Sequence, residues 1–93
     1  MDYLEKYNLT EMDINDLKEL LDEKDINELT LNEVGIKEIL DYLNNIGIKN
    51  IKDVLITAPY IIYSNIEILK NELNEEAVKL INENTNYIEK LNI

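Results

Sequence analysis

Apolar residues recur at helical spacing along most of the chain, and the first stripe predicts an amphipathic helix that begins after Thr10, with charged residues on the opposite face. Thr10 suits the N-cap position and Asp13 suits the third helical position, where the two side chains can form a capping box. The polar residues 22–28 interrupt the stripe and are predicted to form a turn. The stripe consists of Ile14, Leu17, Leu20 and Leu21.

The same arrangement returns twenty residues later and predicts a second helix. Thr30 and Glu33 have the spacing of a capping box. This helix is predicted to end at about Asn45, with Gly47 in the left-handed conformation that commonly terminates helices. Gly35 in its first turns is expected to mark the close approach of a neighbouring helix. The residues predicted to face the core are Val34, Ile36, Ile39, Leu40 and Leu43.

Residues 45–73 hold the single proline and the longest apolar run, and they predict a helix, a break and another helix. A short helix over residues 50–57 ends before Pro59, because proline disfavours helical geometry at the residue that precedes it. Pro59 can open a further turn, since its missing N–H is no loss there. Ser64 is then predicted to be the N-cap residue of the next helix and to form a capping box with Glu67.

These elements predict an all-α fold, a compact array of about five to six short helices that is helical-repeat-like in its centre. Two glycines and one proline among abundant Leu, Ile, Glu and Lys favour helix. Ninety-three residues make one domain. Asn74 and Thr85 are predicted to cap the last two helices. We divide the domain into an acidic arm (residues 10–33), a near-neutral core (residues 34–73) and C-terminal helices (residues 74–93).

The net charge of −11 is the strongest global property, and it is unevenly distributed. Residues 1–33 carry eleven acidic residues and three lysines, whereas residues 34–73 carry five acidic residues and four lysines. Such a surface repels nucleic-acid phosphates and anionic lipids, and it attracts basic protein surfaces. We therefore expect a protein partner with a basic surface and no membrane contact. The candidate partner-binding residues on the acidic arm are Asp13, Asp16, Glu19, Asp22, Glu23, Asp25 and Glu28.

The chain lacks both Cys and His, which removes the usual nucleophile–base pairs and zinc ligands. Residues 22–33 have an acid at each end, as a calcium loop does, but Lys24 and Ile26 stand where ligands belong. We therefore predict a protein that is not an enzyme and that uses no cofactor or metal. The absence of Cys suits a cytoplasmic location, and the bias towards Asn, Ile and Lys indicates an AT-rich genome.

All six aromatic residues are tyrosines, and two of them, Tyr60 and Tyr63, lie three positions apart. This spacing places them on one face of a helical turn, where an exposed pair would suit an interface. We therefore treat them as a secondary candidate surface. The alternative, which we favour, is that both are core residues with their hydroxyls at the rim.

One further pattern spans residues 43–73: a leucine and a glycine end one helix, a short helix follows, and a proline, apolar residues and a serine precede a third helix. The positions are Leu43, Gly47, Ile51, Val54, Leu55, Pro59, Ile62, Ser64, Ile66, Leu69 and Leu73. This pattern resembles the helical repeat of the mitochondrial transcription termination factor family. The resemblance implies a helical-repeat fold and an association with nucleic acid.

A second pattern overlaps the first. The chain reads L-N-E-V-G-I-K over residues 31–37 and I-G-I-K-N-I-K-D-V-L over residues 46–55. This spacing resembles a helix-hairpin-helix unit, which also implies nucleic-acid binding. Asn32 and Glu33 stand where that family has the Pro-Gly of its phosphate-binding hairpin. The lysines available in the two matching regions are Lys37, Lys49, Lys52 and Lys70.

Three functions follow, in this order of preference. The first is a small acidic, non-enzymatic regulator or adaptor that contacts a basic partner through residues 10–33. The second is a nucleic-acid mimic, an inhibitor of a nuclease or CRISPR effector carried by a phage or plasmid, because small size, negative charge and the lack of catalytic groups all fit. The third is a nucleic-acid-associated helical-repeat module, as the two resemblances imply. Each of the three is compatible with a homo-oligomer.

Overall fold

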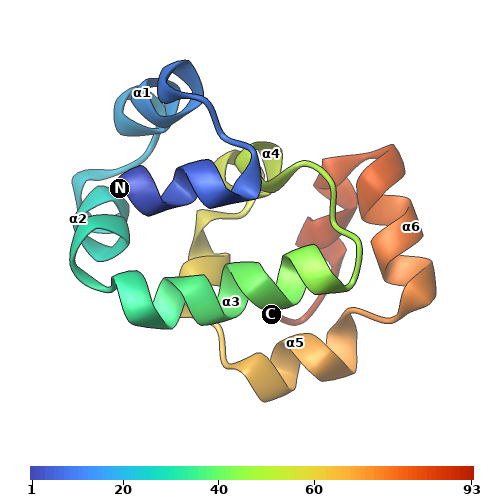
Figure 1. The fold of residues 1–93 in the computed structure, drawn as a ribbon. Coiled ribbons are helices and arrows are strands. Elements are labelled where there is room, and N and C mark those ends of the chain that lie inside the picture. The colour runs from blue at the N-terminus through green and yellow to red at the C-terminus, as the bar shows by residue number, and fades with distance from the viewer.

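The structure is a computed structural model that describes residues 1–93, and it consists of helices and the loops between them (Figure 1). The all-α prediction is confirmed, whereas the predicted number of five to six helices is slightly too low. Six α-helices and three short 3-10 helices are present. In chain order they are η1 (Asp2–Tyr7), α1 (Glu11–Leu20), α2 (Glu23–Leu31), α3 (Glu33–Asn45), α4 (Ile51–Thr57), η2 (Pro59–Tyr63), α5 (Ile66–Glu72), α6 (Glu75–Glu83) and η3 (Thr85–Lys90).

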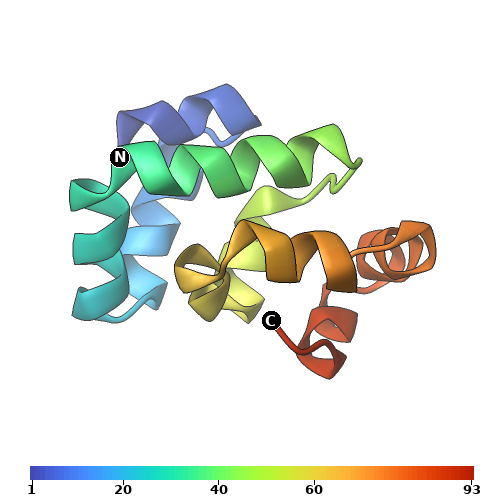
Figure 2. The ribbon, with the colours of Figure 1, turned by 90° about the horizontal axis from the view of Figure 1, so that it is seen from below.

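Helix α4 is the central element of the array. It contacts α1, α3, η2 and η3, so four other elements cover it. Helix α3, the longest, runs across one face with η1 beside it, while α1 and α2 lie at one end of the molecule and α6 at the other (Figures 1 and 2). Helix α5 lies next to α3 on the side away from η1. The whole chain measures 31 × 24 × 22 Å.

Two tyrosines attach η1 to the rest of the fold. The Tyr3 hydroxyl donates a hydrogen bond to the Leu29 carbonyl oxygen at 2.6 Å. The Tyr7 hydroxyl donates to Asp41 Oδ1 at 2.7 Å, and its oxygen lies 3.3 Å from the Lys37 carbonyl oxygen. Both contacts span more than twenty residues of sequence, so they fix the first helix against α2 and α3.

Several helix boundaries follow the capping signals in the sequence. The Thr10 hydroxyl accepts a hydrogen bond from the Asp13 N–H, and the Asp13 carboxylate accepts one from the Thr10 N–H, which completes the predicted capping box of α1. Asn74 caps α6 as predicted, since its side-chain oxygen accepts from the Ala77 N–H at 2.8 Å. These short-range bonds satisfy N–H groups that a helix start leaves unpaired.

The end of α3 is the helix stop that Gly47 predicted. Gly47 has a φ of +98°, its N–H donates to the Asn44 carbonyl, and the Ile48 N–H donates to the Leu43 carbonyl. This pair of bonds is a Schellman motif, in which the residue at the Gly47 position must take a positive φ. Ile48 is consequently directed into the core, where it is buried.

We expect Gly47→Ala to lower the free energy of unfolding by about 1–2 kcal/mol, because a Cβ makes this backbone conformation unfavourable. Steric crowding adds little, since the nearest atom to that Cβ would be Val78 Cγ1 at 3.9 Å. Urea unfolding followed by circular dichroism measures the effect. Gly47→Asn is the matched control and should cost less, because asparagine tolerates positive φ better than alanine does. Equal losses in the two variants would contradict this account.

The predicted polar turn over residues 22–28 is wrong, because residues 23–28 belong to helix α2. Asp22 is the N-cap residue, and the acidic first turn that follows favours the positive end of the helix dipole. The helix is held in place by Leu29, which is 0% exposed. The predicted capping box of Thr30 is also wrong. Its hydroxyl donates to the Ile26 carbonyl inside α2, and Asn32 caps α3 instead.

Gly35 and Ser64 also differ from expectation. A Cβ on Gly35 would lie 2.8 Å from the side chain of Asn32, so the glycine makes room for the cap of its own helix and not for a neighbouring helix. Ser64 is the residue after η2, and Asn65 caps α5 by accepting from the Glu67 N–H at 2.7 Å. The last short helix, η3, is likewise capped by Asn84 one residue before the predicted Thr85.

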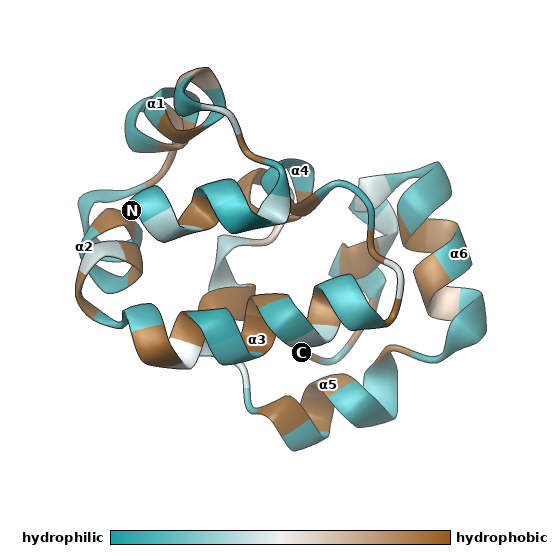
Figure 3. Ribbon diagram, viewed as in Figure 1, coloured by the Kyte–Doolittle hydropathy of each residue, from teal (hydrophilic) through white to brown (hydrophobic).

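The core joins the apolar stripes of all nine elements (Figure 3). Most of the predicted inward positions are buried, including all of those in α3 except Val34, which is 84% exposed. Val34 lies in the first turn and points away from the core stripe of α3. Leu20, at the last position of α1, is 62% exposed for a similar reason, because the chain turns into α2 directly after it. None of the helices combines the length and the apolar content that a membrane span requires.

Candidate functional site

The seven candidate acids of residues 10–33 lie on α1, α2 and the junction between them, at one end of the molecule (Figure 1). The structure separates them into two groups. Four of them bond to other residues of the chain and so contribute to the fold: Asp13, Asp16, Asp25 and Glu28. Three are exposed and outside every ion pair: Glu19, Asp22 and Glu23.

Lys52 joins α4 to the first two of these acids. Its ammonium lies 3.0 Å from Asp13 Oδ1 and 2.8 Å from Asp16 Oδ2. The hydrogen bond from the Thr10 N–H, followed by that from Lys52, lowers the pKa of the Asp13 carboxyl. The hydrogen bonds to Asp16 and then Asp13 raise the pKa of Lys52. These two carboxylates are therefore occupied by an internal cation and are less available to a partner.

Asp25 and Tyr63 connect the two surfaces that the sequence proposed separately. The Tyr63 hydroxyl donates to Asp25 Oδ1 at 2.8 Å, and Asp25 is only 9% exposed. The Lys24 ammonium lies 5.1 Å from the centre of the Tyr63 ring, within cation–π range. Burial, the hydrogen bond to Asp25 and the negative charges of α2 raise the pKa of Tyr63 to about 12. The contact ties the turn η2 to α2.

The rings of Tyr60 and Tyr63 are both exposed. They therefore do not lie within the core, although Tyr63 directs its hydroxyl to a buried partner. The structure thus differs from the arrangement that we favoured from the sequence, because the core-facing positions of η2 are taken by Ile61 and Ile62. Tyr63 is the tyrosine of the pair that lines a concave surface.

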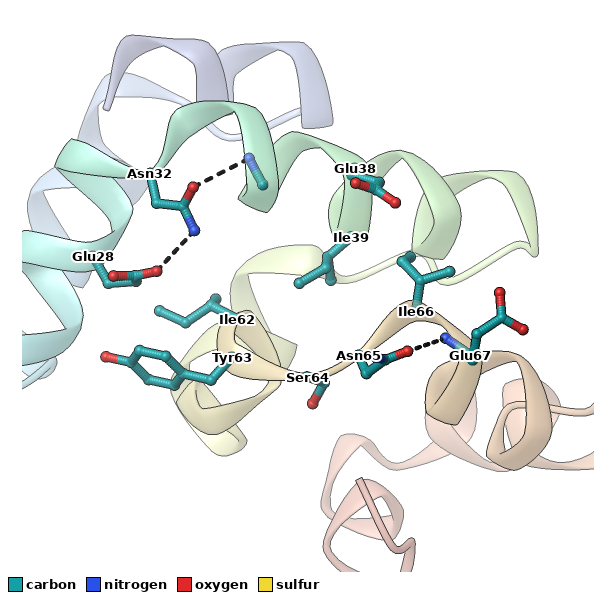
Figure 4. A pocket seen from close by; sticks show the side chains of 11 residues that line it. Glu28, Asn32, Glu38, Ile39, Ile62, Tyr63, Ser64, Asn65, Ile66 and Glu67 are labelled. Atoms are coloured by element: carbon teal, nitrogen blue, oxygen red, sulfur yellow. Dashed lines mark hydrogen bonds between the residues drawn. The ribbon is translucent and has the colours of Figure 1, made fainter.

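That concave surface is a groove of about 540 Å³ between the α2–α3 corner and the segment that joins η2 to α5 (Figure 4). Three isoleucines, Ile39, Ile62 and Ile66, give it apolar walls, and Tyr63 stands at one end. Its remaining lining is polar or acidic, and no lysine lines it. The acidic lining residues are Glu28, Glu38 and Glu67.

The sequence did not indicate this groove. Its walls come from residues 28–39 and from residues 62–67, which are distant in the chain and each look like ordinary helix boundaries. The only local signal is that each segment holds an asparagine that caps a helix, Asn32 in the first and Asn65 in the second. Glu38 and Glu67 carry no feature in the sequence that distinguishes them from other exposed acids.

The lysines of the two matching regions are mostly paired within the chain. Lys37 lies 3.4 Å from Glu33, Lys70 lies 3.7 Å from Glu67, and Lys52 bridges two aspartates of α1. Lys49 is exposed and outside these ion pairs. Such pairing reduces the positive potential available to phosphates.

Comparison with protein-family models, with curated proteins and with solved structures finds no match for this chain. The two family resemblances therefore stay predictions. Within the structure no group of three or more His, Cys, Asp or Glu side chains is placed to hold a metal ion. The candidate site accordingly consists of two features, the three free acids at the α1–α2 junction and the groove beyond the other end of α2.

Proposed function

We propose that the protein is a small, non-enzymatic protein-binding module, a regulator or adaptor that meets the basic surface of a partner with the α1–α2 junction. The observation that carries the proposal is that Glu19, Asp22 and Glu23 are exposed and outside ion pairs, although nearby acids are bonded within the fold. Exposed charges without an internal partner are the ones that can steer and bind an oppositely charged surface.

The charge of the whole chain supports the same proposal. The nine lysines offset fewer than half of the twenty acidic side chains, so the net charge is −11 and the long-range field of the molecule is strongly negative. A field of this sign increases the rate of encounter with basic proteins, and the effect falls with ionic strength. A chain without Cys or His also lacks the commonest catalytic groups, which favours binding over catalysis.

We expect the triple variant Glu19→Lys/Asp22→Lys/Glu23→Lys to lose its partner in affinity purification from the native host followed by mass spectrometry. Reversal of three exposed charges replaces attraction by repulsion, which should lower the recovered amount about tenfold or more. The matched control is Glu75→Lys/Glu76→Lys/Glu83→Lys, because it changes the net charge equally and also reverses two acids in the first turn of a helix.

A partner recovered equally well by both variants would contradict the proposed surface. If neither variant nor the unmodified protein retains any basic protein at low ionic strength, the proposal of a basic partner itself is wrong. Circular dichroism of each variant checks that its helices remain folded. The Lys52 ion pairs and Asp25 are left intact in this design, so lost binding cannot come from breaking those internal contacts.

A second candidate is the nucleic-acid mimic, and the fifteen carboxylates outside ion pairs favour it. The same purification distinguishes it from the adaptor. A mimic occupies the site that nucleic acid uses on a nuclease or similar protein, so duplex DNA should release the partner at constant ionic strength. An adaptor bound elsewhere on its partner should stay bound under the same conditions.

A further inference from the structure

We infer that the groove between α3 and the η2–α5 segment receives a short peptide segment of the partner protein in which basic residues flank apolar ones. The inference rests on the proposed function, because it names the part of a basic partner that this protein binds. It also adds a second contact surface, distinct from the three acids of the α1–α2 junction.

The middle of the groove is apolar. Ile39 and Ile62 are buried among the core residues and present one edge to the groove, while Ile66 is partly exposed beside them (Figure 4). Tyr63 adds an exposed aromatic ring at one end. Apolar and aromatic walls of this kind favour aliphatic side chains of a ligand, whose burial removes both surfaces from water.

Carboxylates stand at both ends of this apolar middle. Glu28 lies at the Tyr63 end, and Glu38 and Glu67 lie at the other (Figure 4). Glu38 is free of hydrogen bonds and ion pairs within the chain. Glu28 accepts one hydrogen bond from Asn32, and Glu67 has an exposed ion pair with Lys70 at 3.7 Å, a geometry that contributes little to stability. Each end can therefore accept a cationic side chain.

The charge and size of the groove decide between possible occupants. Its acidic lining, with no lysine, repels phosphates and so excludes nucleic acid. A second copy of the chain is disfavoured, because two molecules of net charge −11 repel each other. A volume of about 540 Å³ holds a few side chains and not a domain. A short basic and apolar segment of another protein satisfies all three conditions.

The test is a titration of the full-length, ¹⁵N-labelled protein with synthetic peptides, followed by amide chemical shifts. The probe has a Lys-Leu-Val-Lys centre between Gly-Ser flanks, and the controls have Lys-Ser-Ser-Lys and Glu-Leu-Val-Glu centres. We expect the first peptide to shift the amides of Gly35, Ser64, Asn65 and Glu67, with much weaker binding of both controls. Equal binding of Lys-Ser-Ser-Lys would overturn the apolar part of the inference.

Variants of the groove acids test whether these acids, and not acids elsewhere on the surface, bind the peptide. Glu38→Lys/Glu67→Lys should weaken the Lys-Leu-Val-Lys peptide about three- to tenfold, the effect expected from the loss of two partly exposed charge pairs. Glu38→Gln/Glu67→Gln serves if the reversed variant unfolds, and it should weaken binding less. The control Glu83→Lys/Glu89→Lys lies on α6 and η3 and should leave the affinity unchanged. Unchanged affinity in both groove variants overturns the inference.

The outcome is distinguishable from failure of the proposed function. If the peptide does not shift the groove amides but the α1–α2 variant still loses the partner, only the groove inference is wrong. If the peptide shifts the groove amides but the α1–α2 variant keeps the partner, the α1–α2 junction is not the contact surface. Dimerisation of the protein at the concentrations of the titration, measured by sedimentation, would assign the groove to a second copy and overturn the inference.

Discussion

Replacement of Leu29 by alanine is expected to lower the free energy of unfolding by about 2–5 kcal/mol, the usual cost of deleting a fully buried leucine side chain. Leu29 is 0% exposed and holds α2 against the core. Its carbonyl also accepts the hydrogen bond of Tyr3, so movement of α2 would loosen η1 as well. A domain of this size is typically stable by about 5–15 kcal/mol, and the loss would therefore be a large part of the total.

Leu31→Ala is the matched control, because it is the same substitution two residues later in the same helix. Leu31 is 83% exposed, so its removal should change the stability by no more than about 0.5 kcal/mol. Urea unfolding of both variants, followed by circular dichroism, measures the difference. Equal losses of stability in the two variants would contradict the burial of Leu29 and the exposure of Leu31.

A second large effect is expected in alkaline solution, where the protein should lose stability between about pH 10 and pH 12. Burial and the charges of Glu33 and Glu28 raise the pKa of Tyr3 to about 12, and Tyr63 is raised to about the same value. Burial and the hydrogen bond to Asp41 raise the pKa of Tyr7 also. A phenolate at Tyr7 would face the Asp41 carboxylate, which already accepts its hydroxyl at 2.7 Å.

The direction of the effect follows from proton binding. Tyrosines of the unfolded chain lose their protons near pH 10, whereas these three keep theirs in the folded protein. Their contribution is fully present below pH 10, and it is lost as the pH rises because the unfolded state then binds fewer protons than the folded state. Tyrosinate absorbance should accordingly appear at higher pH in the folded protein than in urea.

The variant Tyr3→Phe/Tyr7→Phe separates this effect from the general increase in negative charge. It should be less stable at pH 7, by about 0.5–1.5 kcal/mol for each lost hydrogen bond. Its stability should then fall less steeply between pH 10 and pH 12, since two of the three raised groups are gone. If the free energy of unfolding falls equally steeply with pH in the variant and in the unmodified protein, the role assigned to Tyr3 and Tyr7 is wrong.

The helix ends show which features of this protein can be predicted from residues that are close together in the sequence. The cap of α1 at Thr10, the stop of α3 at Gly47 and the cap of α6 at Asn74 were predictable, because each depends on bonds between residues at most a few positions apart. The same rules were wrong at Thr30 and at Ser64. In both places a neighbouring asparagine offered a competing cap, and the choice between the two depended on where the helix had to start in order to pack.

Exposure of the acids could not be predicted in the same way. Asp13, Asp16, Asp25 and Glu28 look no different in the sequence from Glu19, Asp22 and Glu23. Three of the four bonded acids have partners that are distant in the chain: Lys52 from α4 bonds to Asp13 and Asp16, and the hydroxyl of Tyr63 donates to Asp25. Glu28 is bonded locally, by Asn32 four residues later, but the packing of α4 and η2 against α1 and α2 decides that Asp13, Asp16 and Asp25 are not free for a partner.

The class of fold, several helix boundaries and the strongly negative charge could be read from the residues alone. These depend on composition, on periodicity and on bonds between near neighbours. Three features required the folded chain: the packing of α2 as a helix, the separation of bonded from free acids on α1 and α2, and the groove between the α2–α3 corner and the segment that joins η2 to α5. Each of these depends on contacts between segments that are far apart in the chain, which no local pattern encodes.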